Sequence, residues 1–229
     1  MRIAVVGAGL GGVAAAVGLH RQGHEVTLFE RGAELREKGT GIVVMPNGLR
    51  ALDELFPLGE DQLYWFTDSL LHGPPSGAEE ARREMPSLMA DWHPLVTALI
   101  GATPPEDIYV DPIARLAEPL PSFAVDRIAL LGDAAHAMSP DLGQGSSQAF
   151  EDAAVLTRHL SGAEPADAVE RLLRYDAERR PRANRMMLGA ARQSRLTSRT
   201  GISAWLRDLS LRAVPSRLAT RQMATLWHV

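Results

Sequence analysis

The residues best suited to chemistry lie near the start of the chain, where a short glycine-rich stretch joins two apolar segments. Positions 7–12 read Gly-Ala-Gly-Leu-Gly-Gly, which fits G-x-G-x-x-G, and they follow a β-branched run at 3–6. In such a turn Gly7 permits a tight bend, Gly9 lets a pyrophosphate approach the backbone, and Gly12 allows close helix–strand packing. Gly11 lies in the first turn of the predicted helix, where free N–H groups favour phosphates.

A carboxylate after the next predicted strand completes this pattern. Glu25–Phe29 is β-prone, and Glu30 follows 18 residues beyond Gly12, with Arg31 beside it. An acidic side chain at that position can bind the ribose hydroxyls of an adenine nucleotide. The combination predicts a dinucleotide-binding βαβ unit, against the alternative of an ordinary glycine-rich turn. The motif does not distinguish FAD from NAD(P).

Composition limits the remaining classes of function. The 229 residues carry a net charge of −4, are 45% hydrophobic and include no cysteine. This length suits one large domain or two small ones, and the lack of cysteine excludes disulfides and thiolate metal sites. No His/Asp/Glu cluster has metal-ligand spacing, so no metal is expected. Without a signal-peptide pattern or an apolar run of membrane-spanning length, we expect a cytoplasmic protein.

The last part of the chain is basic. Residues 166–229 hold 13 arginines and five acidic residues, a balance of +8. A nucleic-acid or membrane-surface role is the alternative, but charged faces of amphipathic helices are usually just solvated. We therefore expect no nucleic-acid partner.

Between the glycine-rich start and the basic end, short patterns predict several elements. The expected elements are an extended segment at 42–44, helices at 46–55 and 79–84, an aromatic strand at 63–67, a helix within 86–102 and a strand at 107–110.

A second stretch with chemical potential lies further along. A predicted strand over 127–131 leads into Gly132 and Asp133, and a loop containing Pro140, Gly143, Gln144, Gly145 and Ser146 precedes a predicted helix at 148–160. A carboxylate at a strand's C-terminal end and a glycine-rich loop at a helix start both belong at the ligand edge of an α/β sheet. The alternative for Asp133 is a helix N-cap.

Two histidines and an aromatic cluster invite functional interpretations. His136 shows no acidic or nucleophilic partner in the sequence, and we expect it to be structural, as we do His93 beside Trp92 and Pro94. Tyr64, Trp65 and Phe66 could line a substrate cavity or pack in a core, and both alternatives stay open.

Taken together, the glycine turn with Glu30 and the stretch ALLGDAAHAMSPDLGQGSSQAFEDAAVL resemble the class A FAD-dependent monooxygenases, the aromatic hydroxylases with the p-hydroxybenzoate hydroxylase fold. The segments DWHPLVTALI and YDAERRPRANR extend the resemblance over most of the chain. It implies an α/β fold: a Rossmann-type FAD-binding domain at 1–55 and 106–165, a shortened substrate domain at 56–105, and a C-terminal helical segment at 166–229.

The resemblance also implies a cofactor and a reaction. Asp133 would bind the ribityl chain of FAD, while Pro140 and the loop at 143–145 would lie beside the isoalloxazine ring, with Gly41, Ile42 and Val43 on its other side. NADPH or NADH would reduce the flavin, and a C4a-hydroperoxide would hydroxylate a small aromatic or polycyclic substrate. No residue is assigned as catalytic.

The sequence also departs from the family. The segment after Leu55 runs almost directly to the aromatic strand, and no Asp-Gly dipeptide occurs, so the family's middle section is absent from this sequence. Lost strands would leave an exposed edge that favours self-association, so a homo-oligomer is possible. Two rival hypotheses remain: a noncatalytic nucleotide-binding remnant that acts as an interaction module, and a plain NAD(P) dehydrogenase.

Overall fold

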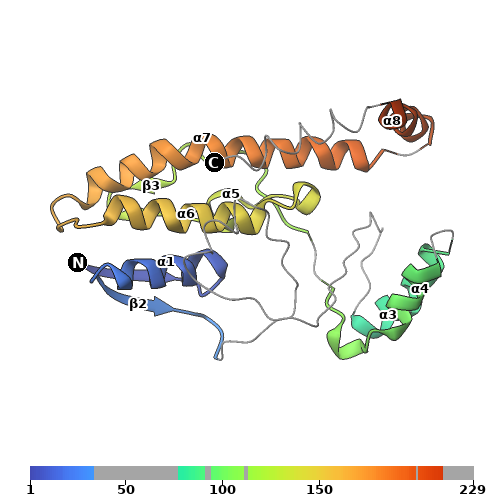
Figure 1. Ribbon diagram of the computed structural model, residues 1–229, viewed down its shortest axis with the longest axis horizontal. Coiled ribbons are helices and arrows are strands. Elements are labelled where there is room, and N and C mark those ends of the chain that lie inside the picture. Colours follow the sequence, from blue (N-terminus) through green and yellow to red (C-terminus); the bar gives the residue numbers. More distant parts are fainter. Residues whose placement is uncertain (34–76, 91–93, 111–112, 200, 214–229) are drawn as a thin grey trace. The chain divides into compact units, whose positions relative to one another are not determined.

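The computed structural model describes residues 1–33, 77–90, 94–110, 113–199 and 201–213 (Figure 1). The chain divides into two compact units, each described by itself. In the first unit the structure describes residues 1–33, 114–199 and 201–213. In the second unit it describes residues 77–90, 94–110 and 113. The elements expected at 42–44, 46–55 and 63–67 lie outside the described residues, as do His93, Tyr64, Trp65 and Phe66.

The first unit begins with the predicted βαβ arrangement. Strand β1 (Arg2–Val6) is followed by helix α1 (Leu10–Arg21) and strand β2 (Glu25–Phe29). The two strands pair in parallel, from Arg2 opposite Glu25 to Val6 opposite Phe29. This arrangement confirms the expected strand–helix–strand order and brings the turn after β1 next to the end of β2.

One face of this small sheet packs against α1 and the other is open within the described residues. Val5 is buried, whereas Val6 and Phe29 are 85% and 54% exposed. An apolar β-branched run is typical of a buried parallel strand, but β1 is covered on only one face, because the described chain supplies a helix to only that face.

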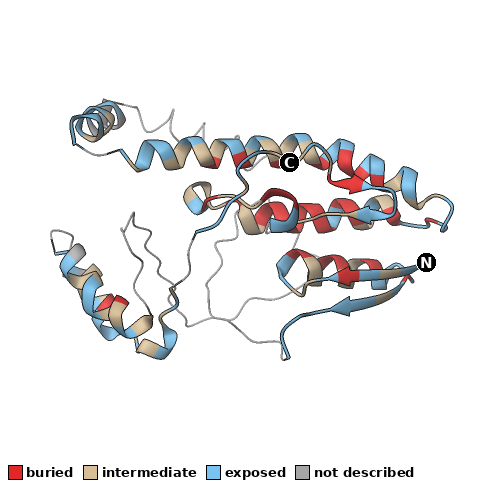
Figure 2. Cartoon of the chain, turned by 180° about the vertical axis from the view of Figure 1, so that it is seen from behind, coloured by how far each residue is buried: buried red, intermediate tan, exposed pale blue. Residues whose placement is uncertain are grey.

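Three helices form layers on the packed side of the sheet (Figure 1). Helix α6 (Gly145–Leu160) lies between α1 and α7 (Ala168–Thr197). The buried residues lie where these helices face one another, as Figure 2 shows. Small side chains allow the close approach: a Cβ atom on Gly18 of α1 would lie only 2.6 Å from the Thr157 hydroxyl of α6.

A hairpin and two short helical turns precede α6 in the chain. Strands β3 (Ala124–Val125) and β4 (Ile128–Ala129) pair antiparallel around a tight turn, in which Asp126 has a positive φ of 50°. They are followed by α5 (Asp133–His136) and the 3₁₀ helix η2 (Pro140–Leu142). The strand expected over 127–131 is thus too long.

The residue after β4 keeps to the hairpin and also contacts α7. The Leu130 N–H donates to the Phe123 carbonyl at 2.8 Å, beside the Ala124–Ala129 pair, and the Leu130 carbonyl accepts from the Tyr175 hydroxyl of α7 at 2.9 Å. Helix α6 begins three residues earlier than expected, after Gly143 adopts a left-handed φ of 60°.

The last helix of the first unit is α8 (Gly201–Ala213). It is tied to the end of α7 through Arg207, whose guanidinium donates to the carbonyls of Leu196 and Thr197 at 3.0 and 2.8 Å. The expected helical character of the C-terminal segment is confirmed for α7 and α8.

The second unit contains α3 (Ala78–Leu88), α4 (Pro94–Ala102) and the 3₁₀ helix η1 (Pro105–Asp107). Ala81 and Ile100 are buried, and Arg82 of α3 donates to the Gly101 carbonyl at 3.2 Å. The strand expected at 107–110 is wrong. Pro105 instead starts a 3₁₀ turn, closed by the Asp107 N–H donating to the Pro104 carbonyl at 3.0 Å.

Candidate functional site

The turn between β1 and α1 has the geometry that its glycines predict. Gly7 has a φ of +99°, and its N–H donates to the Phe29 carbonyl at 2.8 Å, which fixes the turn to the end of β2. A Cβ atom on Gly12 would lie 2.0 Å from the Gly7 carbonyl oxygen, so only glycine allows this closeness. The bend at Gly7 and the close packing at Gly12 are confirmed.

Gly9 differs from Gly12 because the space around it is open. It is the N-cap residue of α1 and has extended backbone angles, and among the described residues beyond its chain neighbours no heavy atom lies within 4 Å of where a Cβ would be. The first N–H groups of the helix have no intrahelical partner, and the helix dipole adds partial positive charge there. This end of α1 can therefore receive an anionic group at backbone distance.

Glu30 lies at the same edge and is bound to the turn. Its carboxylate accepts from the Ala8 N–H at 2.8 Å and from the Gly32 N–H at 2.9 Å. These backbone hydrogen bonds, that of Ala8 foremost, lower the pKa of Glu30 below its ordinary value. The side chain is exposed, as is Arg31, and so the oxygens that hold the turn also face solvent.

The Gly132–Asp133 turn presents a second carboxylate. Gly132 has a φ of +59° and Asp133 is the first residue of α5, with its side chain exposed. The N-cap interpretation of Asp133 is wrong, because Gly132 occupies the cap position and no side-chain cap hydrogen bond forms. Within the described residues the Asp133 carboxylate makes no hydrogen bond or ion pair.

The loop before α6 follows directly. Pro140 is exposed, Gly143 is left-handed, and Gln144 is fully buried as the N-cap residue of α6. Gly145 and Ser146 form the first turn of that helix and are half-buried. The Ser139 hydroxyl at the start of the loop is buried without a hydrogen-bond partner in the described part of the chain. The loop thus brings polar groups and a second helix N-terminus together.

The two glycine turns, distant in sequence, meet at Ala149 of α6. A Cβ atom on Gly11 would lie 3.3 Å from the Ala149 Cβ and 2.7 Å from a methyl group of Leu131, and one on Gly132 would lie 3.5 Å from the same Ala149 Cβ. One small side chain therefore touches both turns. The structure does not describe Gly41, Ile42 or Val43, for which an adjacent position was expected.

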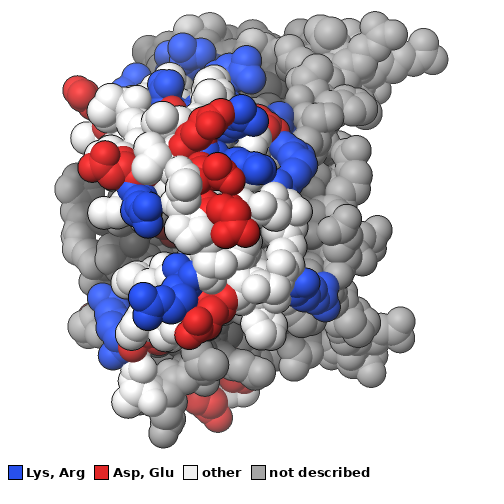
Figure 3. Space-filling view, turned by 90° about the vertical axis from the view of Figure 1, so that its left-hand side faces the viewer, with Lys and Arg blue, Asp and Glu red and all other residues white. Residues whose placement is uncertain are grey.

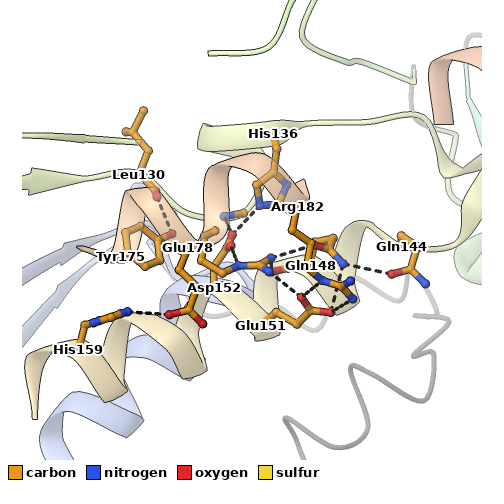
Figure 4. Close-up of polar contacts among 12 residues, drawn as sticks. Leu130, His136, Gln144, Gln148, Glu151, Asp152, His159, Tyr175, Glu178 and Arg182 are labelled. Carbon is orange, nitrogen blue, oxygen red and sulfur yellow. Dashed lines mark hydrogen bonds and ion pairs between the residues drawn. The ribbon is translucent and has the colours of Figure 1, made fainter. Parts of the chain in front are cut away.

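Behind these turns lies a buried network of charged side chains, which Figure 4 shows at close range. Asp152 of α6 accepts from His136 Nε2 at 2.5 Å and from Arg179 Nε of α7 at 2.7 Å. Arg179 also donates to Glu151 at 2.6 Å. Burial alone would lower the pKa of Arg179, but the Asp152 and Glu151 carboxylates outweigh it and raise the pKa.

Sequence reasoning missed this network and the acidic partner of His136. The residues were visible in the stretches EDAAVL and YDAERR, but an acidic pair in a helix ordinarily indicates a solvated face. Tyr175 was missed likewise: it is fully buried, and its hydroxyl donates to Leu130. Burial raises the pKa of Tyr175, so this phenol stays protonated and keeps donating.

Charges on the surface alternate in sign. Figure 3 shows basic and acidic side chains interspersed on one face. Arg158 and His159 both bind Glu178, and Arg174 binds Glu170 at 2.5 Å. Among the described residues no group of three metal-ligating side chains comes together, and no described helix is long and apolar enough to span a membrane.

Comparisons with known proteins identify the kind of domain. A family described as "FAD binding domain" matches residues 79–190, and one described as "NAD(P)-binding Rossmann-like domain" matches residues 5–50. The chain is 36% identical over 163 residues to the aurachin C monooxygenase/isomerase of Stigmatella aurantiaca. The aligned region covers 70% of this chain and 41% of the relative. It is also 40% identical over 111 residues to the 6-hydroxynicotinate 3-monooxygenase of Bordetella bronchiseptica, and that alignment covers 48% of this chain and 28% of the relative.

Solved structures show the same fold. A crystal structure of Klebsiella pneumoniae HpxO complexed with FAD and uric acid superposes with a TM-score of 0.83 at 19% identity, covering 99% of this chain and 96% of the other. The sequence matches span less than half the length of the two curated relatives named above. The chain is a homologue of the class A FAD-dependent aromatic monooxygenases and has the Rossmann-type fold of their FAD-binding domain.

Proposed function

We propose that this protein binds FAD and uses NADPH or NADH and O₂ to hydroxylate a small aromatic or polycyclic molecule. The observation that carries the proposal is the meeting of the two glycine turns at Ala149, with open space at Gly9 and an exposed carboxylate at Asp133. A dinucleotide needs both features, a backbone that its phosphates can approach and an acceptor for its hydroxyl groups. The family matches support the same cofactor.

The residues present fit FAD in chemical type. The backbone at Gly9 and Gly11 would hold the pyrophosphate, because no described side chain fills the space at Gly9 and the helix N-terminus favours anions. Glu30 would accept from the adenosine ribose, since its lowered pKa keeps it anionic. Asp133 would accept from the ribityl hydroxyls. Gly7 and Gly12 belong to the same predicted cofactor site, where they would shape the turn.

The loop ahead of α6 would lie beside the flavin ring. Pro140, Gly143 and Gly145 leave the backbone accessible there, and the N-terminus of α6 would favour negative charge on the reduced ring. We assign Gly132, Gln144, Ser146, Arg31 and the segment 41–43 to the same cofactor site as expected neighbours. Bound FAD would accept a hydride from the nicotinamide and activate O₂. The chain's own task is to hold the ring and to exclude water.

The overall reaction balances as follows. The substrate C–H, O₂, NAD(P)H and a proton give the substrate C–OH, water and NAD(P)⁺. If water enters the site, the same reductant and O₂ give hydrogen peroxide instead. Because the family's middle section is absent from this sequence, we expect the site to be incompletely closed and much of the reductant to end as peroxide.

The division into domains belongs to the same proposal. Residues 1–55 and 106–165 would form the FAD-binding part, residues 56–105 a remnant of the substrate domain, and residues 166–229 a helical segment. Cytoplasmic location and a homo-oligomeric state remain predictions. Cell fractionation and the mass of the purified protein in solution test them.

The experiment that tests the proposed activity compares two products. Purified protein is loaded with FAD and mixed with NADPH or NADH, O₂ and a panel of electron-rich phenols and hydroxylated N-heterocycles. We expect FAD-dependent oxidation of the nicotinamide, with peroxide exceeding hydroxylated product. A folded protein that takes up FAD but oxidises neither nicotinamide would contradict the proposed activity. It would favour the noncatalytic remnant.

A further inference from the structure

Asp152 connects three segments of the first unit through one buried carboxylate. Its side chain is fully buried on α6. The oxygen Oδ2 accepts from the Gly132 N–H at 2.9 Å and from His136 Nε2 at 2.5 Å, and Oδ1 accepts from Arg179 Nε at 2.7 Å. Figure 4 shows Asp152 and His136 pointing toward each other. Each oxygen of this carboxylate therefore has at least one fixed partner.

The two partners of Oδ2 lie at opposite ends of α5. Gly132 immediately precedes this four-residue helix, and His136 is its last residue. A single helical turn is not stable on its own, because the conformational entropy lost in forming it exceeds the stabilisation from its one or two hydrogen bonds. Contacts with the rest of the unit must therefore help to hold it, and one oxygen of Asp152 provides a contact at each end. Asp133 lies between the two contact points.

The other oxygen anchors the carboxylate from behind. Arg179 on α7 donates to Asp152, to Glu151 at 2.6 Å and to the Gln148 side chain at 2.8 Å. A buried carboxylate held on both sides in this way has little freedom to rotate. The orientation of α5 is thus set by the packing of α6 against α7.

We propose that Asp152 is a positioning residue for FAD: it fixes the Gly132–Asp133 turn so that the exposed Asp133 carboxylate faces the cofactor. This inference rests on the proposed FAD site. It adds that the affinity for FAD depends on a buried carboxylate that does not touch the cofactor. It also links cofactor binding to α7, which contributes Arg179.

The test compares two buried aspartates with similar partners. Asp152→Asn keeps the size and one acceptor oxygen but removes the charge. Asp176→Asn is the matched control, because Asp176 is 8% exposed and accepts from a backbone N–H, that of Phe123 at 2.6 Å, and from an arginine, Arg180 Nε at 3.1 Å. Its backbone partner lies on a different turn. Both variants lose an ion pair, which is buried at Asp152 and partly exposed at Asp176, where the Arg180 side chain is 35% exposed. Only Asp152→Asn loses the contacts around Asp133.

Three measurements are made on the full chain: the melting temperature without FAD, the FAD dissociation constant by titration, and the visible circular dichroism of the flavin at saturation. We expect both variants to melt at lower temperature. Only Asp152→Asn should raise the dissociation constant, by about tenfold, as for one hydrogen bond of ordinary strength. It should also change the flavin dichroism, which depends on how the ring and its chain are held.

Equal dissociation constants and equal flavin spectra for wild type and Asp152→Asn would overturn the inference, as would an equal loss of affinity in Asp176→Asn. If Asp152→Asn does not fold, His136→Phe replaces it, because it removes the contact at the end of α5 and leaves Asp152 with Arg179. The same tenfold loss is then expected, and unchanged affinity contradicts the inference. A wild-type protein that binds no FAD would instead refute the proposed function.

Discussion

Replacing Gly9 with valine separates cofactor binding from folding, because the structure leaves space there. Apart from its chain neighbours, no described residue places a heavy atom within 4 Å of the position of a Cβ on Gly9, and its φ of −71° and ψ of 175° are accessible to valine. The loss of a favourable N-cap residue costs about 1 kcal/mol. Valine also lowers the conformational entropy of the unfolded chain, which stabilises the folded state by about 0.4–1 kcal/mol. The melting temperature should therefore change by no more than about 2–4 °C.

Binding of FAD should respond much more strongly. A valine side chain would occupy the space that the pyrophosphate needs, so at least one backbone hydrogen bond to a charged group is lost. Such a bond contributes about 1.5–3 kcal/mol, which raises the dissociation constant about 10- to 150-fold. Titration of the folded variant with FAD, followed by flavin fluorescence, measures this loss directly.

Gly12→Ala is the control for damage to the fold. Even this small side chain would place a Cβ 2.0 Å from the Gly7 carbonyl oxygen, so the turn must move. We expect it to cost about 1–3 kcal/mol of stability, the range for overpacking. A Gly9→Val variant that melts like wild type and binds FAD equally well would show that Gly9 does not face the cofactor.

Asp133→Ala should leave the melting temperature unchanged and weaken FAD binding by about 1.5–3 kcal/mol, because the exposed carboxylate has no partner within the described residues; a titration that shows equal affinity contradicts this. Arg179→Leu should lower the free energy of unfolding, measured in urea, by about 3–5 kcal/mol, because the buried carboxylates of Asp152 and Glu151 lose their ion pairs with Arg179; a decrease below about 1 kcal/mol would contradict this prediction. The lowered pKa of Glu30 means that its contribution to stability is complete above its ordinary pKa of 4.5 and is lost as the pH falls through its folded-state pKa. The stability difference between wild type and Glu30→Gln should therefore shrink below about pH 4.5, and a difference that grows on acidification would contradict the assignment.

The first βαβ arrangement could be predicted from the sequence because its information is local. The β-branched run, the spaced glycines and the acid after the second strand each constrain their own few residues. Helix α1 follows the glycine turn as the motif predicts, and Gly12 packs as its place in the motif indicates. Predictions of this kind depend on backbone geometry that a single motif determines.

The remaining part of the site depends on partners that are distant in sequence. Asp152 finds its partners 16, 20 and 27 residues away, and no periodic pattern marks such contacts. The strand expected at 127–131 is only two residues long, and the Leu130 carbonyl that follows it accepts from the Tyr175 hydroxyl, 45 residues further along the chain. A local preference for strand structure does not indicate such a distant partner. The resemblance to a family indicated where ligands belong but not which buried groups hold the turns.

The most direct test of the account is a calorimetric titration of the folded 229-residue chain with FAD, in parallel with NAD⁺ and NADP⁺. The account predicts uptake of about one FAD per chain and a yellow protein whose released cofactor is FAD, with much weaker binding of the nicotinamide nucleotides. A folded protein that stays colourless and takes up no FAD, or that binds NAD⁺ more tightly than FAD, would contradict it.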